Sequence, residues 1–124
     1  MKDKKKVLVI DDEDMHLYTA KGLLESDHID VITHKGSFGA TNSIRNVHPD
    51  LVLLDINMPA LSGENLVSLI KPFCVVTKTP ILFSSSNDES KLRELVALHG
   101  VQGYICKGDI AELRYKVNEC FDSA

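Results

Sequence analysis

The strongest structural signal in this chain lies in Leu51-Val52-Leu53-Leu54-Asp55-Ile56-Asn57-Met58-Pro59. Its first four residues are large and apolar without a break, whereas a strand with one face in water would alternate apolar and polar side chains. The run therefore predicts a short central strand of a parallel sheet, buried on both faces. It stops at the carboxylate of Asp55, and Pro59 prevents the segment from continuing as a sheet strand. Ligands of open α/β sheets bind in the crevice outside the carboxyl ends of the strands. We therefore expect Asp55 to lie at this crevice, where its carboxylate can take part in a reaction.

Outward from this stretch, a second unbroken apolar run, Val7-Leu8-Val9-Ile10, also ends on acidic residues, Asp11 and Asp12. Further strands are predicted at 29–34, 80–83 and 101–106, and helices at 15–24, 37–47, 64–71, 88–99 and 109–121. The segment 73–79 has no clear pattern. Strands that alternate with helices predict an α/β fold, a doubly wound five-stranded parallel sheet with helices on both faces.

Local signals predict where several helices begin and end. Ser37 is expected to be the N-cap of the second helix, and Pro72 is expected to end the third. Gly100 is the predicted stop of the fourth helix. Asp109 and Glu112 have the spacing of a capping box at the start of the last one.

Size and composition indicate one soluble domain that spans residues 1–124, with 44% hydrophobic and 26% charged residues. The net charge of −4 and the lack of a long basic run argue against direct nucleic-acid binding. The three cysteines form no short-spaced pair, so reduced thiols are expected. No stretch is long and apolar enough for a membrane span, and we expect a cytoplasmic protein. The five histidines are scattered, and we interpret them as surface or loop residues.

Polar side chains follow the predicted strands at one edge of the sheet. The first strand ends at Asp11 and Asp12, the third at Asp55, the fourth at the serines 84–86 and the fifth at Lys107. Three gathered carboxylates repel one another, so one would take up a proton or the group would bind a cation. Oxygen ligands without histidine or cysteine favour Mg²⁺, or Mn²⁺ in its place. A metal, a hydroxyl and a lysine around one carboxylate indicate phosphoryl transfer.

With these residues in place, the chain resembles the receiver domains of two-component response regulators, the CheY-like family, over essentially its full length. The stretch from Asp55 to Pro59, with Gly63, matches the family signature D-x-x-M-P-x-x-x-G. The resemblance implies a flavodoxin-like fold with Asp55 as the phosphoacceptor. It also implies an Mg²⁺ ion held by Asp11, Asp12, Asp55 and the backbone carbonyl of Asn57.

The resemblance assigns three further residues. Lys107 would contact the phosphoryl group. Ser85 would supply the hydroxyl, with Ser84 as the alternative. Tyr104 would be the switch aromatic, and simple packing of its ring on the strand is the alternative interpretation. One departure stands out, because the family usually has proline after this lysine, with a cis bond, and this chain has Gly108. A cis bond is costly without proline, so we expect a trans bond or a more mobile loop here.

The function that follows is a phosphoryl-accepting signalling switch, which catalyses only its own phosphorylation and dephosphorylation. Its expected partners are a sensor histidine kinase or phosphotransfer protein and a downstream output protein or domain, with a second copy of the chain as a further candidate. They would bind the face made by the fourth helix, fifth strand and fifth helix.

Three alternative functions use a related fold or similar residues. A haloacid-dehalogenase-type phosphatase would have its nucleophile on the first strand and a second aspartate two residues later, where this chain has Asn57 after Asp55. An FMN binder would have a phosphate loop after the first strand, where this chain has acids. The remaining alternative is a receiver-like interaction module that is not phosphorylated, which Gly108 keeps open.

Overall fold

The computed structural model of the chain describes residues 4–58, 63–86 and 88–122. The strands are β1 (Lys5–Asp11), β2 (Ile29–Lys35), β3 (Leu51–Asp55), β4 (Ile81–Ser85) and β5 (Gly103–Cys106). The helices are α1 (Asp14–Leu24), α2 (Ala40–Val47), α3 (Gly63–Thr77), α4 (Glu89–His99) and α5 (Ile110–Asp122). Within the described residues, no helix is long and apolar enough to cross a membrane.

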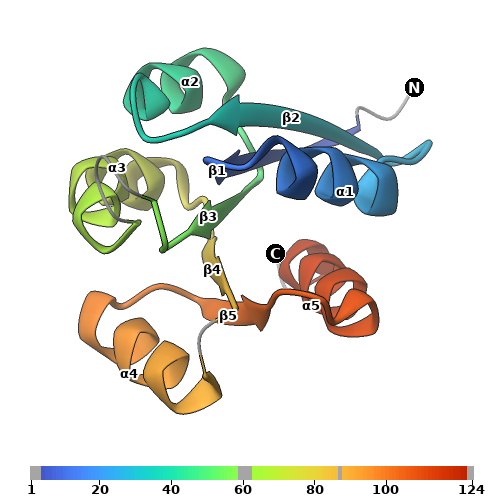
Figure 1. The fold of residues 1–124 in the computed structure, drawn as a ribbon. Helices are drawn as coiled ribbons and strands as arrows, with labels where there is room; N and C mark the ends of the chain where they lie inside the picture. The colour runs from blue at the N-terminus through green and yellow to red at the C-terminus, as the bar shows by residue number, and fades with distance from the viewer. Residues whose placement is uncertain (1–3, 59–62, 87, 123–124) are drawn as a thin grey trace.

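The strands form one parallel sheet in the order β2-β1-β3-β4-β5. Helices α2, α3 and α4 cover one face of it, and α1 and α5 cover the other (Figure 1). The prediction of a doubly wound α/β fold is confirmed. The chain moves to one side of β1 to make β2 and to the other side to make β3, so the strand order reverses between β1 and β3. This reversal leaves a crevice outside their carboxyl ends.

The central strand is β3, and every residue from Leu51 to Asp55 is buried, as its unbroken apolar run predicts. Its side chains alternate between two hydrophobic clusters. Val52 and Leu54 pack under α2, α3 and α4, whereas Leu51 and Leu53 pack under α1 and α5. Burial on both faces explains why this strand, unlike the edge strand β2, shows no polar alternation.

The predicted end of the third helix at Pro72 is wrong, because α3 continues to Thr77 with Pro72 inside it. A proline within a helix removes one backbone hydrogen bond and clashes with the preceding turn. Here Ile70 and Cys74, four residues apart, lie on either side of Pro72 and are both buried in the core. We attribute the continuation to this apolar contact, which offsets the local cost.

The predicted N-cap of the second helix is also wrong. The helix α2 begins at Ala40, and Gly39 occupies the N-cap without a side-chain hydrogen bond to the helix. Gly36 and Gly39 both adopt a φ of +77°, so the chain turns once before Ser37 and once between Ser37 and the helix. Ser37 contributes its backbone carbonyl, which accepts from the Ala40 N–H at 3.2 Å.

Other helix ends agree with the local signals. The Asp88 carboxylate accepts hydrogen bonds from the backbone N–H groups of Ser90 and Lys91, and Gly100 ends α4 with a φ of +68°. At α5, Asp109 accepts from the Glu112 N–H at 3.0 Å, which is half of the predicted capping box. The Glu112 carboxylate accepts from the Cys106 N–H instead, at 3.3 Å. The stretch Ala60-Leu61-Ser62-Gly63 predicts a turn, and its first three residues lie outside the described residues.

Candidate functional site

The acidic residues that follow β1 and β3 meet in the crevice between these strands. Ile10 and Leu54 are register partners, so Asp11 and Asp55, the last residues of their strands, lie side by side. Both are nearly inaccessible, at 3% and 2% exposure, and Asp12 is half-buried. One carboxylate oxygen from each of the three residues lies within 4.8 Å of the others. The predicted acidic cluster therefore exists as a group of converging oxygens.

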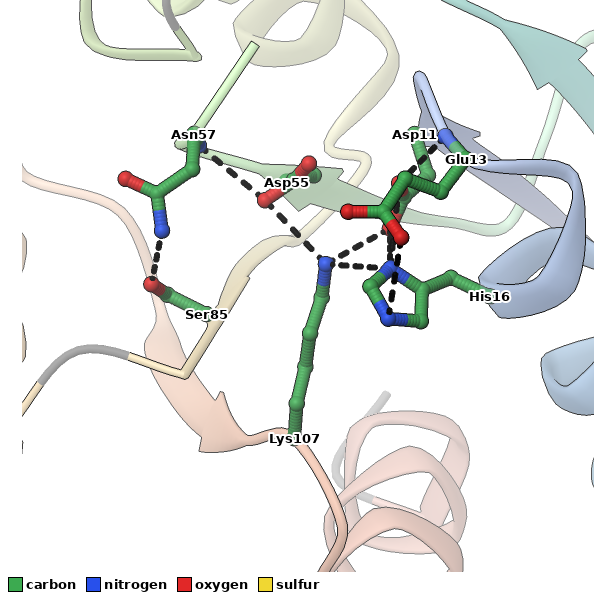
Figure 2. Close-up of polar contacts among 7 residues, drawn as sticks. All are labelled: Asp11, Glu13, His16, Asp55, Asn57, Ser85 and Lys107. Atoms are coloured by element: carbon green, nitrogen blue, oxygen red, sulfur yellow. Dashed lines mark hydrogen bonds and ion pairs between the residues drawn. The ribbon is translucent and has the colours of Figure 1, made fainter.

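Lys107 supplies the positive charge of the site. It follows β5, and its backbone N–H donates to the Ser85 carbonyl at 2.9 Å. Its ammonium Nζ lies 2.9 Å from Asp11 Oδ2 and 3.3 Å from Asp55 Oδ1 (Figure 2). The structure thus brings together Asp11, Asp12, Asp55 and Lys107, as the shared edge of their strands predicts.

The two buried carboxyls respond differently to this environment. Burial raises the pKa of Asp55, and the nearby Asp11 charge adds to the effect, while the Asn57 N–H and Lys107 only partly oppose it. Burial also acts to raise the pKa of Asp11, but hydrogen bonds from Lys107 and from the Glu13 N–H outweigh burial and lower it. Asp11 is therefore strongly stabilised as a carboxylate, whereas ionising Asp55 beside it is costly.

Asn57 and Ser85 contact each other across the crevice from the lysine. The Asn57 backbone N–H donates to Asp55 Oδ1 at 3.0 Å, and its side-chain Nδ2 donates to Ser85 Oγ at 2.7 Å (Figure 2). Ser85 is fully buried. Since side chains alternate along a strand, Ser84 points to the opposite face of β4. There it lines a cavity of about 340 Å³ that also includes Asp55, Lys107 and apolar residues of α1 and α5.

Asp12 offers an oxygen that the protein leaves unsatisfied. Its Oδ1 is buried and has no hydrogen-bond partner among the described residues. A buried carboxylate oxygen without a partner is unfavourable unless a cation or water satisfies it. With the nearby oxygens of Asp11 and Asp55, this all-oxygen donor set fits a hard divalent cation such as Mg²⁺.

The interpretation of all five histidines as surface or loop residues did not identify His16 as a residue of the crevice. This residue lies in the first turns of α1, and its ring Nδ1 is 2.9 Å from Lys107 Nζ and 3.4 Å from Asp11 Oδ1. A histidine five residues after the acid that ends a strand is the only signal in the sequence, and it does not reveal that His16 of α1 meets Lys107, which follows β5.

Tyr104 lies on β5, away from the carboxylates. Its ring is half-buried, its hydroxyl donates to Glu89 Oε2 at 2.7 Å and accepts from Arg93 Nε at 3.1 Å, and Lys116 Nζ sits 4.1 Å from the ring centroid. It therefore connects α4, β5 and α5. No bond among the described residues is cis, so the Lys107–Gly108 bond is trans, and Gly108 has a φ of +95°.

Comparisons with known proteins agree with this geometry. The family model "Response regulator receiver domain" matches residues 7–118. PilG of Pseudomonas aeruginosa is 40% identical over 86 residues, which cover 69% of this chain and 64% of PilG, just under two thirds of that protein. The polar-differentiation response regulator DivK of Brucella ovis is 26% identical over 107 residues, which cover 83% of this chain and 84% of DivK.

Solved structures show the same fold. The chemotaxis protein CheY4 of Vibrio cholerae aligns with a TM-score of 0.85 at 20% identity, covering 95% of this chain and 99% of that one. A CheY-like receiver domain protein of Methanospirillum hungatei aligns with a TM-score of 0.86 at 21% identity, covering 98% and 96%. From the family match, the fold and the converging acidic residues, we conclude that this chain belongs to the response regulator receiver domains of two-component signalling.

Proposed function

We propose that the chain is a phosphoryl-accepting switch, with Asp55 as the phosphoacceptor and a histidine kinase or phosphotransfer protein as the donor. The observation that carries the proposal is the position of the Asp55 carboxylate. It lies at the end of the central strand, within 4.8 Å of oxygens from Asp11 and Asp12 and 3.3 Å from the Lys107 ammonium. A buried nucleophile surrounded by groups that neutralise phosphoryl oxygens suits this chemistry.

In the proposed reaction, an Asp55 carboxylate oxygen attacks the phosphorus of a phosphohistidine on the partner. A P–O bond forms, the P–N bond breaks, and the imidazole leaves with the electron pair of that bond and takes a proton from solvent. The product is an acyl phosphate, whose hydrolysis by water returns the carboxylate and inorganic phosphate. The chain is in this sense a switch rather than an enzyme that turns over a separate substrate.

Asp11, Asp12 and Asp55, together with the backbone carbonyl of Asn57, would hold Mg²⁺. The unsatisfied Asp12 Oδ1 supports this assignment. When bound, the cation would neutralise negative charge on the phosphoryl oxygens as it develops. The protein side chains contribute the remaining contacts, with the Lys107 ammonium donating to one phosphoryl oxygen and the Ser85 hydroxyl to another.

The proposed output is a change on the face formed by α4, β5 and α5. A hydrogen bond from Ser85 to the phosphoryl group would draw the loop into α4 inward, and Tyr104 would then turn toward the core. Phosphorylation would favour one of two packings by binding it better. An output protein or domain, or a second copy of this chain, would recognise the changed face.

The test is intact-mass spectrometry after incubation with acetyl phosphate and Mg²⁺. We expect one added phosphoryl group on the wild type and none on Asp55→Asn, because the amide has nearly the same shape but is not nucleophilic. The matched control is Asp27→Asn, which changes an exposed aspartate in the loop before β2 and should be phosphorylated normally. Phosphate on the Asp55→Asn variant would show that the acceptor is another residue. A wild type that takes phosphate from no donor would favour the interaction module that is not phosphorylated.

A further inference from the structure

Three acceptors surround the Lys107 ammonium, and one of them is unexplained by the proposed chemistry. A lysine ammonium has three N–H donors. Its described acceptors are Asp11 Oδ2 at 2.9 Å, Asp55 Oδ1 at 3.3 Å and His16 Nδ1 at 2.9 Å (Figure 2). The ring of His16 thus supplies the third acceptor and completes the set.

Two distances bear on the tautomer of the His16 ring, because Nδ1 lies 2.9 Å from Lys107 Nζ and 3.4 Å from Asp11 Oδ1. If Nδ1 carried a proton, two donors would face each other at 2.9 Å, one of them a cation. The contact with Lys107 is favourable only when Nδ1 presents its lone pair to the ammonium. The other tautomer would donate from Nδ1 to the Asp11 carboxylate at the longer distance of 3.4 Å, so the shorter contact favours the lone pair on Nδ1. The proton of the neutral ring is then on Nε2, which lies 3.8 Å from Glu13 Oε2. The neighbouring carboxylate thus faces the N–H side of the ring.

The loop that positions Asp11 also positions His16. The Glu13 N–H donates to Asp11 Oδ1 at 3.0 Å, and the His16 N–H donates to the Glu13 carbonyl at 3.1 Å. The His16 side chain is 37% exposed, so the ring borders the crevice and is not part of the hydrophobic core. Its place is therefore explained by its contacts with polar groups, above all with Lys107.

We propose that His16 is a positioning residue of the phosphoryl site, which accepts a hydrogen bond from Lys107 and fixes the ammonium between Asp11 and Asp55. Its effect on reaction rate rests on the proposed function of Asp55. Without this acceptor, the ammonium has two carboxylates as its described partners and is free to turn toward either one or toward solvent. Fewer molecules then present an N–H to the incoming phosphoryl oxygen, and transfer slows.

The kinetic test compares three variants. His16→Leu removes the acceptor, His16→Asn keeps an acceptor oxygen close to the position of Nδ1, and His28→Leu changes an exposed histidine in the loop before β2. With acetyl phosphate and Mg²⁺, we expect His16→Leu to be phosphorylated about tenfold more slowly, as is typical when a residue that orients a functional group is lost. His16→Asn should restore a rate close to that of the wild type, and His28→Leu should not change it. Equal rates for wild type and His16→Leu, or equal slowing by Leu and Asn, would overturn the proposal.

A spectroscopic test needs no phosphodonor and separates the two proposals. At alkaline pH, ¹⁵N NMR of the wild type should show the neutral His16 ring with its proton on Nε2 and not on Nδ1. The Lys107 side-chain Nζ resonance should shift in His16→Leu and stay near its wild-type position in His16→Asn. A proton on Nδ1, or a Lys107 resonance unchanged in His16→Leu, contradicts the proposal. If the wild type takes up no phosphate, the proposed function fails, and these spectra alone decide the role of His16.

Discussion

At the scale of single residues, the site contains a charge conflict that one lysine only partly resolves. Asp11 and Asp55 are both buried, and both contact the Lys107 ammonium. Asp11 has the closer contact, at 2.9 Å against 3.3 Å, and accepts a further hydrogen bond from Glu13. The pKa of Asp11 is therefore lowered, while burial raises that of Asp55. The proposed acceptor is thus the member of the pair that most benefits from a cation.

The raised pKa of Asp55 predicts how stability depends on pH in the absence of metal. Since the folded pKa lies above the unfolded one, the folded state holds this proton more tightly between the two values. The contribution of Asp55 to the free energy of unfolding is fully present below the ordinary aspartate pKa of about 3.9. It is lost as the pH rises through the pKa of Asp55 in the folded state. Asp55→Asn stays neutral throughout. Its free energy of unfolding, minus that of the wild type, should therefore grow with pH across that window.

Urea denaturation at a series of pH values without Mg²⁺ measures this difference. Asp11 contributes with the opposite sign, but it is present in both proteins, so the comparison reports mainly on Asp55. Asp27→Asn controls for the removal of one carboxylate far from the site. A difference that stays constant or shrinks as pH rises would mean that Asp55 is not destabilised by burial.

The unsatisfied oxygen of Asp12 predicts a metal response. Mg²⁺ at about ten times its dissociation constant should raise the free energy of unfolding of the wild type by about 1.4 kcal/mol. Asp12→Asn should lose most of this gain, because it removes the carboxylate charge and replaces one of the two oxygens beside the cation by an NH2 group, which cannot bind a metal. It should also melt higher than the wild type in the absence of metal, since repulsion within the cluster is relieved.

Thermal melts with and without Mg²⁺ provide the measurement, and Asp27→Asn is again the control. The control should keep the full metal-induced increase in melting temperature. A wild type that shows no such increase would count against a cation site at Asp11, Asp12 and Asp55.

At the scale of elements, α3 shows burial overriding a local signal. Pro72 lies inside the helix and is exposed, while Ile70 and Cys74 on either side of it are buried. Pro72→Ala should restore an N–H that can donate to the carbonyl of Ser68 and should remove the clash of the proline ring with that turn. We expect it to raise the free energy of unfolding by about 1–3 kcal/mol. The greater freedom of the unfolded chain without proline reduces this gain by a fraction of a kcal/mol.

The matched control for this element is Val76→Ala, which shortens a side chain that is 83% exposed near the end of the same helix. Its effect on urea denaturation should stay within about 0.5 kcal/mol. If Pro72→Ala destabilises the protein, the proline fits its position in α3 without strain and our explanation of the continued helix is wrong.

At the scale of the whole molecule, Tyr104 lies on the proposed output face and contacts both α4 and α5. In the unphosphorylated structure its hydroxyl is held by Glu89 and Arg93 of α4, and its carbonyl accepts from Lys116 of α5 at 2.5 Å. A turn of this ring toward the core has to break the two hydroxyl hydrogen bonds, each contributing about 0.5–1.5 kcal/mol. These contacts therefore favour the outward packing.

Beryllium fluoride with Mg²⁺, a mimic of the phosphoryl group, should shift amide NMR signals of α4, β5 and α5. Tyr104→Phe loses both hydroxyl contacts, so without the mimic its signals should already lie partway toward the bound positions. The control is Tyr115→Phe, which removes an exposed hydroxyl contact to Glu119 within α5 and should leave the equilibrium unchanged. Shifts confined to α1 and α2, with the Tyr104 region silent, would contradict the proposed output face.

The sequence by itself determined the sheet and the edge at which the chemistry gathers. The unbroken apolar runs before Asp11 and Asp55 are local patterns of burial, and the alternation of strands with helices requires a parallel sheet. Parallel strands place their carboxyl ends at one edge, so Asp11, Asp12, Asp55 and Lys107 had to lie near each other. The end of α4 at Gly100 was also predictable, because a glycine after the last residue of a helical pattern is a local signal.

Only the tertiary structure decided features that depend on how elements pack. The helix α3 passes Pro72 because Cys74 finds a place in the core, and α2 begins at Ala40 because the chain turns at Gly36 and Gly39. The contact of His16 with Lys107 joins residues 91 positions apart. Sequence periodicity describes the faces of one element, whereas such a contact depends on the distance and rotation between two elements, which are set by the packing of side chains from both.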